Sequence, residues 1–195
     1  ERPEGDFCPI CTLPILLPLA DGSVFFACCV KRVCHGCTLA AQKRGMHDCP
    51  FCRTPRQEDD KSALAMIQKR VDAKDPAAIT FLANQYYLGG LGLEKDATRA
   101  FELWKVAAGL GSIDAHNSLG SRYFHGVGVT YDIAKAVQHW ETAAMKGITM
   151  ARCDLGTVEY QIGNPERAVR HYLIAAKMGD KTALNNIKEM FVDGC

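Results

Sequence analysis

The sequence predicts two structural parts: a small metal-stapled domain near the N-terminus, followed by an all-α solenoid of helix-turn-helix repeats. Two observations support this fold class. Eight of the ten cysteines in the 195-residue chain lie between positions 8 and 52, mostly in Cys-x-x-Cys pairs. Beyond residue 75, a set of small, aromatic and glycine positions recurs after 36 and then 32 residues. A fixed period of this length is typical of stacked helical repeats.

The clustered cysteines favour metal over disulfides. They form four pairs: Cys8 and Cys11, Cys28 and Cys29, Cys34 and Cys37, and Cys49 and Cys52. Two thiolates at Cys-x-x-Cys spacing can reach one zinc ion at a Zn–S distance of about 2.3 Å. Four pairs supply two closed tetrahedral sites, so the sequence predicts two structural Zn²⁺ ions. A domain this small buries too little apolar surface to fold alone, and bound zinc would supply much of its folding free energy.

The second pair departs from this pattern, because Cys28 and Cys29 are adjacent. Neighbouring side chains in an extended segment point to opposite faces, so joint ligation requires a local turn. The alternative is that one of the two is a spectator and that His35 or His47 completes the set of ligands.

The composition changes along the chain from cysteine-rich to helical and repetitive, and this change predicts three segments. Residues 1–56 form the cysteine-rich domain, and residues 57–74 form a polar linker and a connecting helix. Ser62 is expected to cap this helix. The packed side of the helix carries Ala63, Met66, Ile67 and Arg70, and it can dock the two halves together. Residues 75–195 hold three repeats and the start of a fourth.

Each repeat is expected to form two antiparallel helices. Asp96, Asp132 and Asn164 stand where the second helices need an N-cap, and Pro165 suits a first helical position. The glycines expected to end these helices in the left-handed conformation are Gly111, Gly147 and Gly179. Trp104, Trp140 and Tyr172 share one repeat position and are expected in the core. Cys153 is expected to be a small buried hydrophobe, and His116, His125, His139 and His171 show no paired metal spacing.

The second repeat, from Leu119-Gly120 through Gly126-Val-Gly128-Val129 to Ala143-Ala144 and Gly147, resembles the Sel-one-like (Sel1-like) repeats. The resemblance covers about residues 75–195, with Leu93 in place of the loop valine in the first repeat. It implies a right-handed α-solenoid without catalytic residues. It also implies a surface that binds a protein substrate or adaptor.

The cysteine pattern over residues 7–56 resembles a RING finger of the all-cysteine kind. The resemblance implies a cross-brace with Cys8, Cys11, Cys34 and Cys37 on one ion and Cys28, Cys29, Cys49 and Cys52 on the other. RING fingers bind a ubiquitin-conjugating enzyme charged with ubiquitin and act by positioning the thioester. By this resemblance Ile10 and Pro50 would contact that enzyme. Arg53 would be the linchpin that hydrogen-bonds both the enzyme and ubiquitin.

Two functions from different classes remain open at this stage. The first is a RING-type ubiquitin ligase whose repeats recruit the substrate. The alternative is a non-catalytic zinc-binding scaffold that mediates protein–protein interactions. Ala41 favours the alternative, because many RING fingers carry a large side chain at this position, although Leu39 can substitute for it.

Charge and composition exclude other classes. Eight thiolates and two Zn²⁺ lower the formal net charge from +1 to about −3, which argues against nucleic acid as a partner. No segment has the length and hydropathy of a membrane helix. Zinc-binding thiolates must stay reduced, so an intracellular, cytoplasmic location is expected. The chain begins with Glu1 rather than Met, so we expect it to be part of a longer protein.

Overall fold

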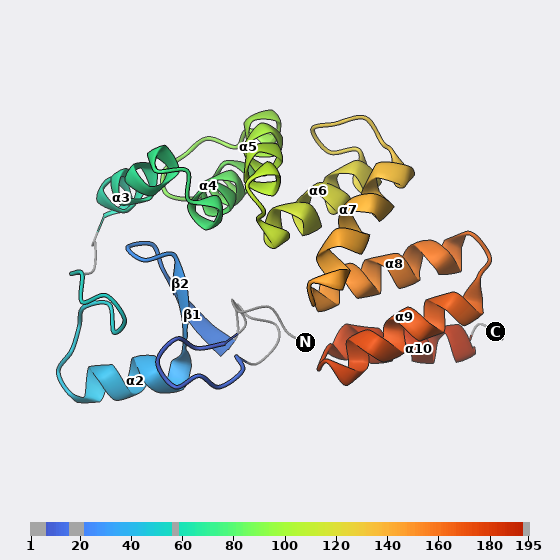
Figure 1. Cartoon of the computed structure of the whole chain (residues 1–195), viewed down its shortest axis with the longest axis horizontal. Coiled ribbons are helices and arrows are strands. Elements are labelled where there is room, and N and C mark those ends of the chain that lie inside the picture. The colour runs from blue at the N-terminus through green and yellow to red at the C-terminus, as the bar shows by residue number, and fades with distance from the viewer. Residues whose placement is uncertain (1–6, 16–21, 56–58, 193–195) are drawn as a thin grey trace. The chain divides into compact units, whose positions relative to one another are not determined.

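The structure is a computed structural model that describes residues 7–15, 22–55 and 59–192 (Figure 1). By its internal contacts the chain divides into two compact units that meet in sequence between Ser112 and Ile113. The N-terminal unit contains both the cysteine-rich segment and the first repeat, so the predicted domain boundaries at residues 56 and 74 stay a prediction. Residues 57 and 58 of the predicted linker, residues 1–6 and Cys195 lie outside the described residues.

The cysteine-rich segment is built on a β-hairpin and a short helix. Strands β1 (Ser23–Phe26) and β2 (Lys31–Cys34) pair antiparallel, with Ser23 opposite Cys34 and Phe26 opposite Lys31. Helix α2 (His35–Lys43) begins directly after β2. The small core combines three apolar side chains, Ile15, Phe26 and Val33, with buried cysteines of the metal-ligand pattern. A core with so few apolar side chains is consistent with a domain that needs bound metal in order to fold.

Helix α3 (Asp60–Asp72) is the predicted connecting helix, but the predicted cap was wrong. Asp59 is the N-cap, and its carboxylate accepts a hydrogen bond of 2.8 Å from the backbone N–H of Ser62. An aspartate three residues earlier offers the same cap geometry with a charged acceptor, so the helix begins before Ser62. Ile67, on the predicted packed side, is completely buried.

The first repeat consists of α4 (Pro76–Leu88) and α5 (Ala97–Gly109). Asp75 caps α4 with Pro76 at the first helical position, and Asp96 caps α5 through the backbone N–H of Arg99. Gly89 ends α4 in the left-handed conformation, which costs glycine little because it has no Cβ.

In the part of the C-terminal unit that the structure describes, five helices form a stack, drawn from yellow-green to red in Figure 1. They are α6 (Ile113–His125), α7 (Ile133–Met145), α8 (Thr149–Gln161), α9 (Pro165–Lys177) and α10 (Lys181–Val192). Each helix packs on the next, most extensively within the pairs α6–α7 and α8–α9. The predicted helix-turn-helix repeats are thereby confirmed, whereas the handedness of the stack stays a prediction.

The recurring aromatic side chains form the core of each pair, as predicted. Trp104, Trp140 and Tyr172 are only 2 to 3% exposed, and Cys153 is buried in α8. Gly111, Gly147 and Gly179 all have positive φ, each two positions after the last residue of its helix. Asn164 occupies the predicted N-cap position of α9, but its side chain makes no capping bond. Its amide donates instead to a carboxylate oxygen of Glu159 at 3.0 Å.

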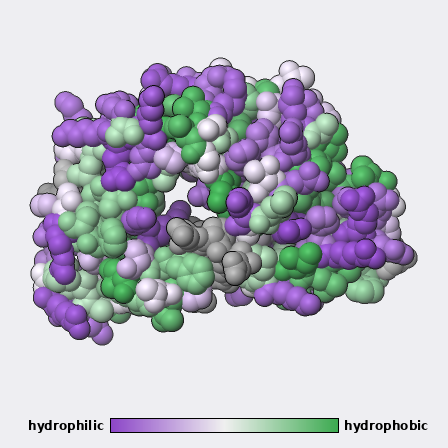
Figure 2. Space-filling view, viewed as in Figure 1, coloured by the Kyte–Doolittle hydropathy of each residue, from purple (hydrophilic) through white to green (hydrophobic). Residues whose placement is uncertain are grey.

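On the face drawn in Figure 2, hydrophilic side chains lie between separate hydrophobic patches. Within the described residues, none of the helices combines the length and the apolar character that crossing a membrane requires.

Candidate metal centres

The structure gathers the eight clustered cysteines into two quartets. One contains Cys8, Cys11, Cys34 and Cys37, and the other contains Cys28, Cys29, Cys49 and Cys52. Within each quartet all four Sγ atoms lie within 4.8 Å of one another. This membership is the same as that of the cross-brace implied by the RING resemblance. None of these eight cysteines forms a disulfide.

The sulfur–sulfur distances fit a tetrahedral zinc ion. With Zn–S bonds of about 2.3 Å, the edge of a regular tetrahedron is about 3.8 Å. The distance from Cys11 Sγ to Cys34 Sγ is 3.8 Å, and that from Cys29 Sγ to Cys49 Sγ is also 3.8 Å. Cys28 and Cys52 are slightly closer, at 3.4 Å. Four thiols with no open position match a structural zinc site rather than a hydrolytic one.

The first and fourth cysteine pairs lie on two turns of the same form. In the first turn the N–H of Cys8 donates to the carbonyl of Leu13, and the N–H of Thr12 donates to the carbonyl of Cys8. In the other turn, the N–H of Cys49 donates to the carbonyl of Thr54, and the N–H of Arg53 donates to the carbonyl of Cys49. The residue after each pair has positive φ, 59° at Thr12 and 63° at Arg53. These turns aim both sulfurs of a Cys-x-x-Cys pair toward one point.

The third pair uses the start of a helix. Cys34 is the N-cap of α2, and its Sγ accepts a hydrogen bond of 3.4 Å from the backbone N–H of Cys37. Burial raises the pKa of Cys34, and the hydrogen bond from Cys37 at the start of the helix partly opposes this rise.

The adjacent second pair is accommodated by the hairpin turn. Residues 27–30 form the turn between β1 and β2, and Val30 there has φ 52°. This turn brings Cys28 and Cys29 into the same quartet. Among the described residues, neither His35 nor His47 belongs to a group of three or more potential ligands.

Within each quartet, burial and shared hydrogen bonds raise the pKa of some sulfurs and lower that of others, Cys8 and Cys52 among the latter. Burial, followed by hydrogen bonds with neighbouring sulfurs, raises the pKa of Cys28 and of Cys37. Burial and the charge of Cys49 raise the pKa of Cys29 to about 12. Burial also raises the pKa of Cys52, but hydrogen bonds with the hydroxyl and backbone of Thr54 outweigh it and bring it to about 6. Four thiolates at this spacing would repel one another, and a divalent metal between them would offset that repulsion.

The residues predicted to contact a conjugating enzyme lie at the surface of the same module. The side chains of Ile10 and Leu39 are 43% and 52% exposed, Pro50 is partly exposed, and Ala41 is buried. Arg53 is exposed, and its guanidinium donates to the sulfur of Met46 at 2.6 Å. Ala41 therefore offers no contact surface, whereas Leu39 does.

Sequence reasoning missed one close pair in the C-terminal unit. His116 of α6 and His139 of α7 face each other with their Nδ1 atoms 2.9 Å apart, and Tyr123 stacks on His139. Burial, followed by the charge of His116, lowers the pKa of His139. The separation is that of a direct hydrogen bond. The two positions lie 23 residues apart on different helices, so no local spacing could have revealed them.

The fold and these centres define a class of protein: a helical-repeat protein joined to a cysteine module that can bind metal. Solenoids of this kind present extended surfaces for protein partners. The Sel1 repeat family matches residues 76–112, 113–148 and 150–180, which is more than half of the chain. The chain belongs to the Sel1 repeat family. No RING family matches the cysteine-rich segment.

Solved structures agree with this assignment. A Sel1 repeat protein from Oxalobacter formigenes is 28% identical with a TM-score of 0.60, over 68% of this chain and 56% of that one. The c5321 protein of uropathogenic Escherichia coli, a protective antigen with an SLR fold, is 25% identical with a TM-score of 0.65. That match covers 73% of this chain and 31% of c5321. The chain thus spans less than two thirds of either protein. No curated protein matches the sequence.

Proposed function

We propose that the chain is a RING-type ubiquitin ligase. In this proposal the cysteine module binds two structural Zn²⁺ ions and a ubiquitin-conjugating enzyme charged with ubiquitin. The Sel1 repeats recruit the protein substrate or an adaptor, and the chain works in a reducing, intracellular compartment, the cytoplasm. It has no catalytic residue of its own and acts by positioning the thioester.

The interleaving of the two quartets is the observation that supports the proposal most strongly. The first and third pairs share one candidate site, and the second and fourth share the other. Bound zinc would supply folding free energy of about 10 kcal/mol per site, and the module would lose its fold without it.

The surface chemistry also agrees with the proposal. Ile10 and Leu39 expose apolar side chains that a protein partner can bury. Arg53 follows directly after the last cysteine, and its planar guanidinium can serve two acceptors at once. The bond to the neutral sulfur of Met46 is weak, so a carboxylate or carbonyl of a partner can displace it.

The proposal is tested by an in vitro ubiquitination panel across conjugating enzymes with the purified chain. We expect autoubiquitination with at least one enzyme, and a decrease of 10-fold or more for Arg53→Ala. Arg44→Ala is the matched control, because Arg44 is another exposed arginine of the same module. Activity that is unchanged in Arg53→Ala, in a protein with full zinc content, would contradict the assigned role of Arg53.

The second candidate is a non-catalytic scaffold in which zinc only stabilises an interaction module. The buried Ala41 is the observation that favours it, because this position offers a conjugating enzyme no side chain. A panel in which every conjugating enzyme is inactive and none binds the chain would support the scaffold over the ligase.

A further inference from the structure

The turn that carries Cys28 and Cys29 is an unusual ligand loop. Both adjacent sulfurs belong to one quartet, which an extended segment would not allow. The turn ends at Val30 with φ 52°, a conformation that a β-branched residue rarely adopts. Such backbone strain costs about 1–3 kcal/mol and persists only when the surroundings hold it.

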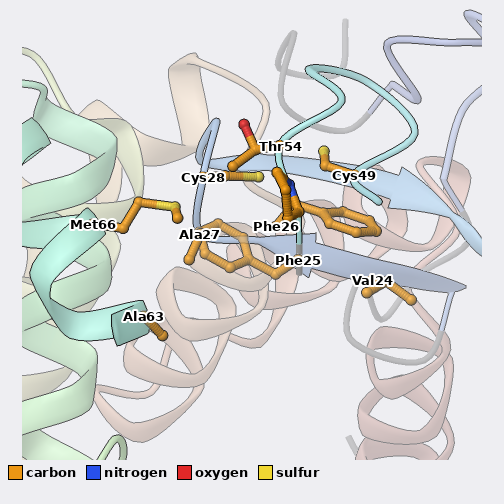
Figure 3. A pocket seen from close by; sticks show the side chains of 10 residues that line it. Val24, Phe25, Phe26, Ala27, Cys28, Cys49, Thr54, Ala63 and Met66 are labelled. Atoms are coloured by element: carbon orange, nitrogen blue, oxygen red, sulfur yellow. The ribbon is translucent and has the colours of Figure 1, made fainter. Parts of the chain in front are cut away.

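Close packing does not hold this turn on the side of α3. A cavity of about 230 Å³ lies there, between the hairpin and the helix. Figure 3 shows Phe25, Ala27 and Cys28 on the hairpin side of the cavity and Ala63 and Met66 on the helix side. This open pocket leaves the turn without close-packed neighbours on that side, so another contact has to hold it.

A hydrogen bond from α3 supplies that support. One terminal nitrogen of the Arg70 guanidinium, Nη1, lies 3.5 Å from the carbonyl oxygen of Cys28 and donates to it. The other two guanidinium nitrogens bond to the carboxylate of Asp75, the Nε atom at 2.9 Å. Asp75 is itself fixed, because its other oxygen caps α4 through Ala77 and Ala78. Arg70 is therefore held in place before it meets the turn.

An aromatic contact fixes the adjoining strand against the same repeat. The rings of Phe25 in β1 and Phe81 in α4 stack with centroids 4.2 Å apart and an interplanar angle of 11°. Arg32 lies over the ring of Phe25 at 5.7 Å. The hairpin is thus held at its strand by Phe81 and at its tip by Arg70, and both residues come from the helical part of the unit.

We propose that Arg70 is a positioning residue for the second quartet, through which the helical repeats support metal binding by the cysteine module. This inference rests on one part of the proposed function, the binding of two zinc ions. It does not depend on ligase activity. Four thiolates and a divalent ion leave that centre with a net charge of −2. A guanidinium bonded to a ligand's carbonyl orients the ligand and opposes that charge. Loss of such supporting hydrogen bonds typically lowers metal affinity by about 10- to 100-fold.

The test uses Co²⁺, whose thiolate complexes absorb visible light, as the probe in the full chain. Two parent proteins separate the sites: Cys11→Ser disables the first quartet and Cys52→Ser disables the second. Adding Arg70→Ala should lower Co²⁺ affinity by about 10- to 100-fold in the Cys11→Ser parent and leave the Cys52→Ser parent unchanged. Lys69→Ala, an exposed neighbour on α3, should change neither.

The ion pair between Arg70 and Asp75 allows a second, independent test. Asp75→Asn should weaken the same site, whereas Asp96→Asn, which also alters an aspartate cap but has no arginine partner of this kind, should not. Circular dichroism checks that the helices remain folded in every variant. Equal affinity with and without Arg70, or equal losses at both quartets, would overturn the inference while leaving zinc binding intact. If the unmodified chain binds no Co²⁺, the metal proposal itself fails.

Discussion

A comparison between repeats predicts that Ser121→Asn stabilises the C-terminal unit. Positions 84, 121 and 157 are equivalent, since each follows the small residue that accepts an aromatic ring. In the first repeat, Trp104 Nε1 donates to Asn84 Oδ1 at 3.0 Å. In the third, the hydroxyls of Tyr172 and Thr157 are 3.0 Å apart.

The middle repeat lacks this bond. Trp140 is 2% exposed, and its buried indole N–H has no hydrogen-bond partner. A buried donor without a partner costs about 1–3 kcal/mol. Ser121 is too short to serve it, and its hydroxyl accepts from Arg122 at 3.1 Å instead. Ser121→Asn should therefore raise the unfolding free energy by about 1 kcal/mol, or the melting temperature by roughly 4–8 °C for a unit of this size.

Thermal and urea unfolding followed by the fluorescence of Trp140 measures this gain, with Trp104→Phe as a common background. Ser121→Ala is the control, because it removes the hydroxyl without adding an acceptor. The middle repeat differs from the first repeat in how closely its aromatic ring approaches the first helix of its pair, and this could prevent the expected gain in stability. A Cβ at Gly120 would lie 2.6 Å from the Trp140 ring, so this ring sits very close to α6. A destabilised Ser121→Asn variant would mean that the close approach leaves no room for the amide, and the equivalence of the repeats would be refuted.

Three further predictions concern other parts of the chain. Elemental analysis should find two zinc ions per chain, and a strong chelator should unfold the cysteine module but leave the C-terminal helices folded; a zinc-free chain with an intact module would contradict the metal assignment. Gly156→Ala places a Cβ about 2.7 Å from the Tyr172 ring and should cost about 1–3 kcal/mol in chemical denaturation, whereas Gly109→Ala, with open space, should be neutral or slightly stabilising. Burial and the charge of Asp180 raise the pKa of Asp154 to about 7. The folded chain then binds more protons than the unfolded chain between about pH 4 and pH 7, so stability falls as the pH rises through this window. Asp154→Asn should abolish this pH dependence and raise the free energy of unfolding at pH 8 by roughly 2–4 kcal/mol. Identical profiles of unfolding free energy against pH for the variant and the unmodified chain would refute the prediction.

The repeats were predictable because their signals are local. Glycine, aspartate and aromatic positions recur with a period, and each acts within its own turn or helix pair. The predicted core position of Trp140 and the caps at Asp96 and Asp132 followed from this. The prediction for Asn164 failed in part because Glu159, five residues earlier, competes for its side chain, and such competition depends on helix ends that the pattern does not locate.

The candidate site was less predictable where it depends on distant groups. Cys-x-x-Cys spacing reveals a local turn, so three of the four cysteine pairs were clear from the sequence. The adjacent pair remained ambiguous because its geometry depends on the φ of Val30 and on Arg70, which lies 42 residues from Cys28. The pair of His116 and His139 likewise arises only from the packing of α6 on α7.

The backbone conformation of Arg53 allows the effect of its side chain on ubiquitin transfer to be measured apart from its effect on stability. Arg53 has φ 63°, a conformation that favours glycine and costs other residues about 1–2 kcal/mol. Thr12 has nearly the same φ in the equivalent turn. Arg53→Gly should therefore leave the stability of the zinc-loaded module unchanged or raise it by up to about 1 kcal/mol, while ubiquitin transfer falls 10-fold or more. Thr12→Gly has the same backbone effect but should retain transfer. Equal activity losses in both variants would mean that the turn, rather than the guanidinium, determines transfer, and the linchpin assignment would be withdrawn.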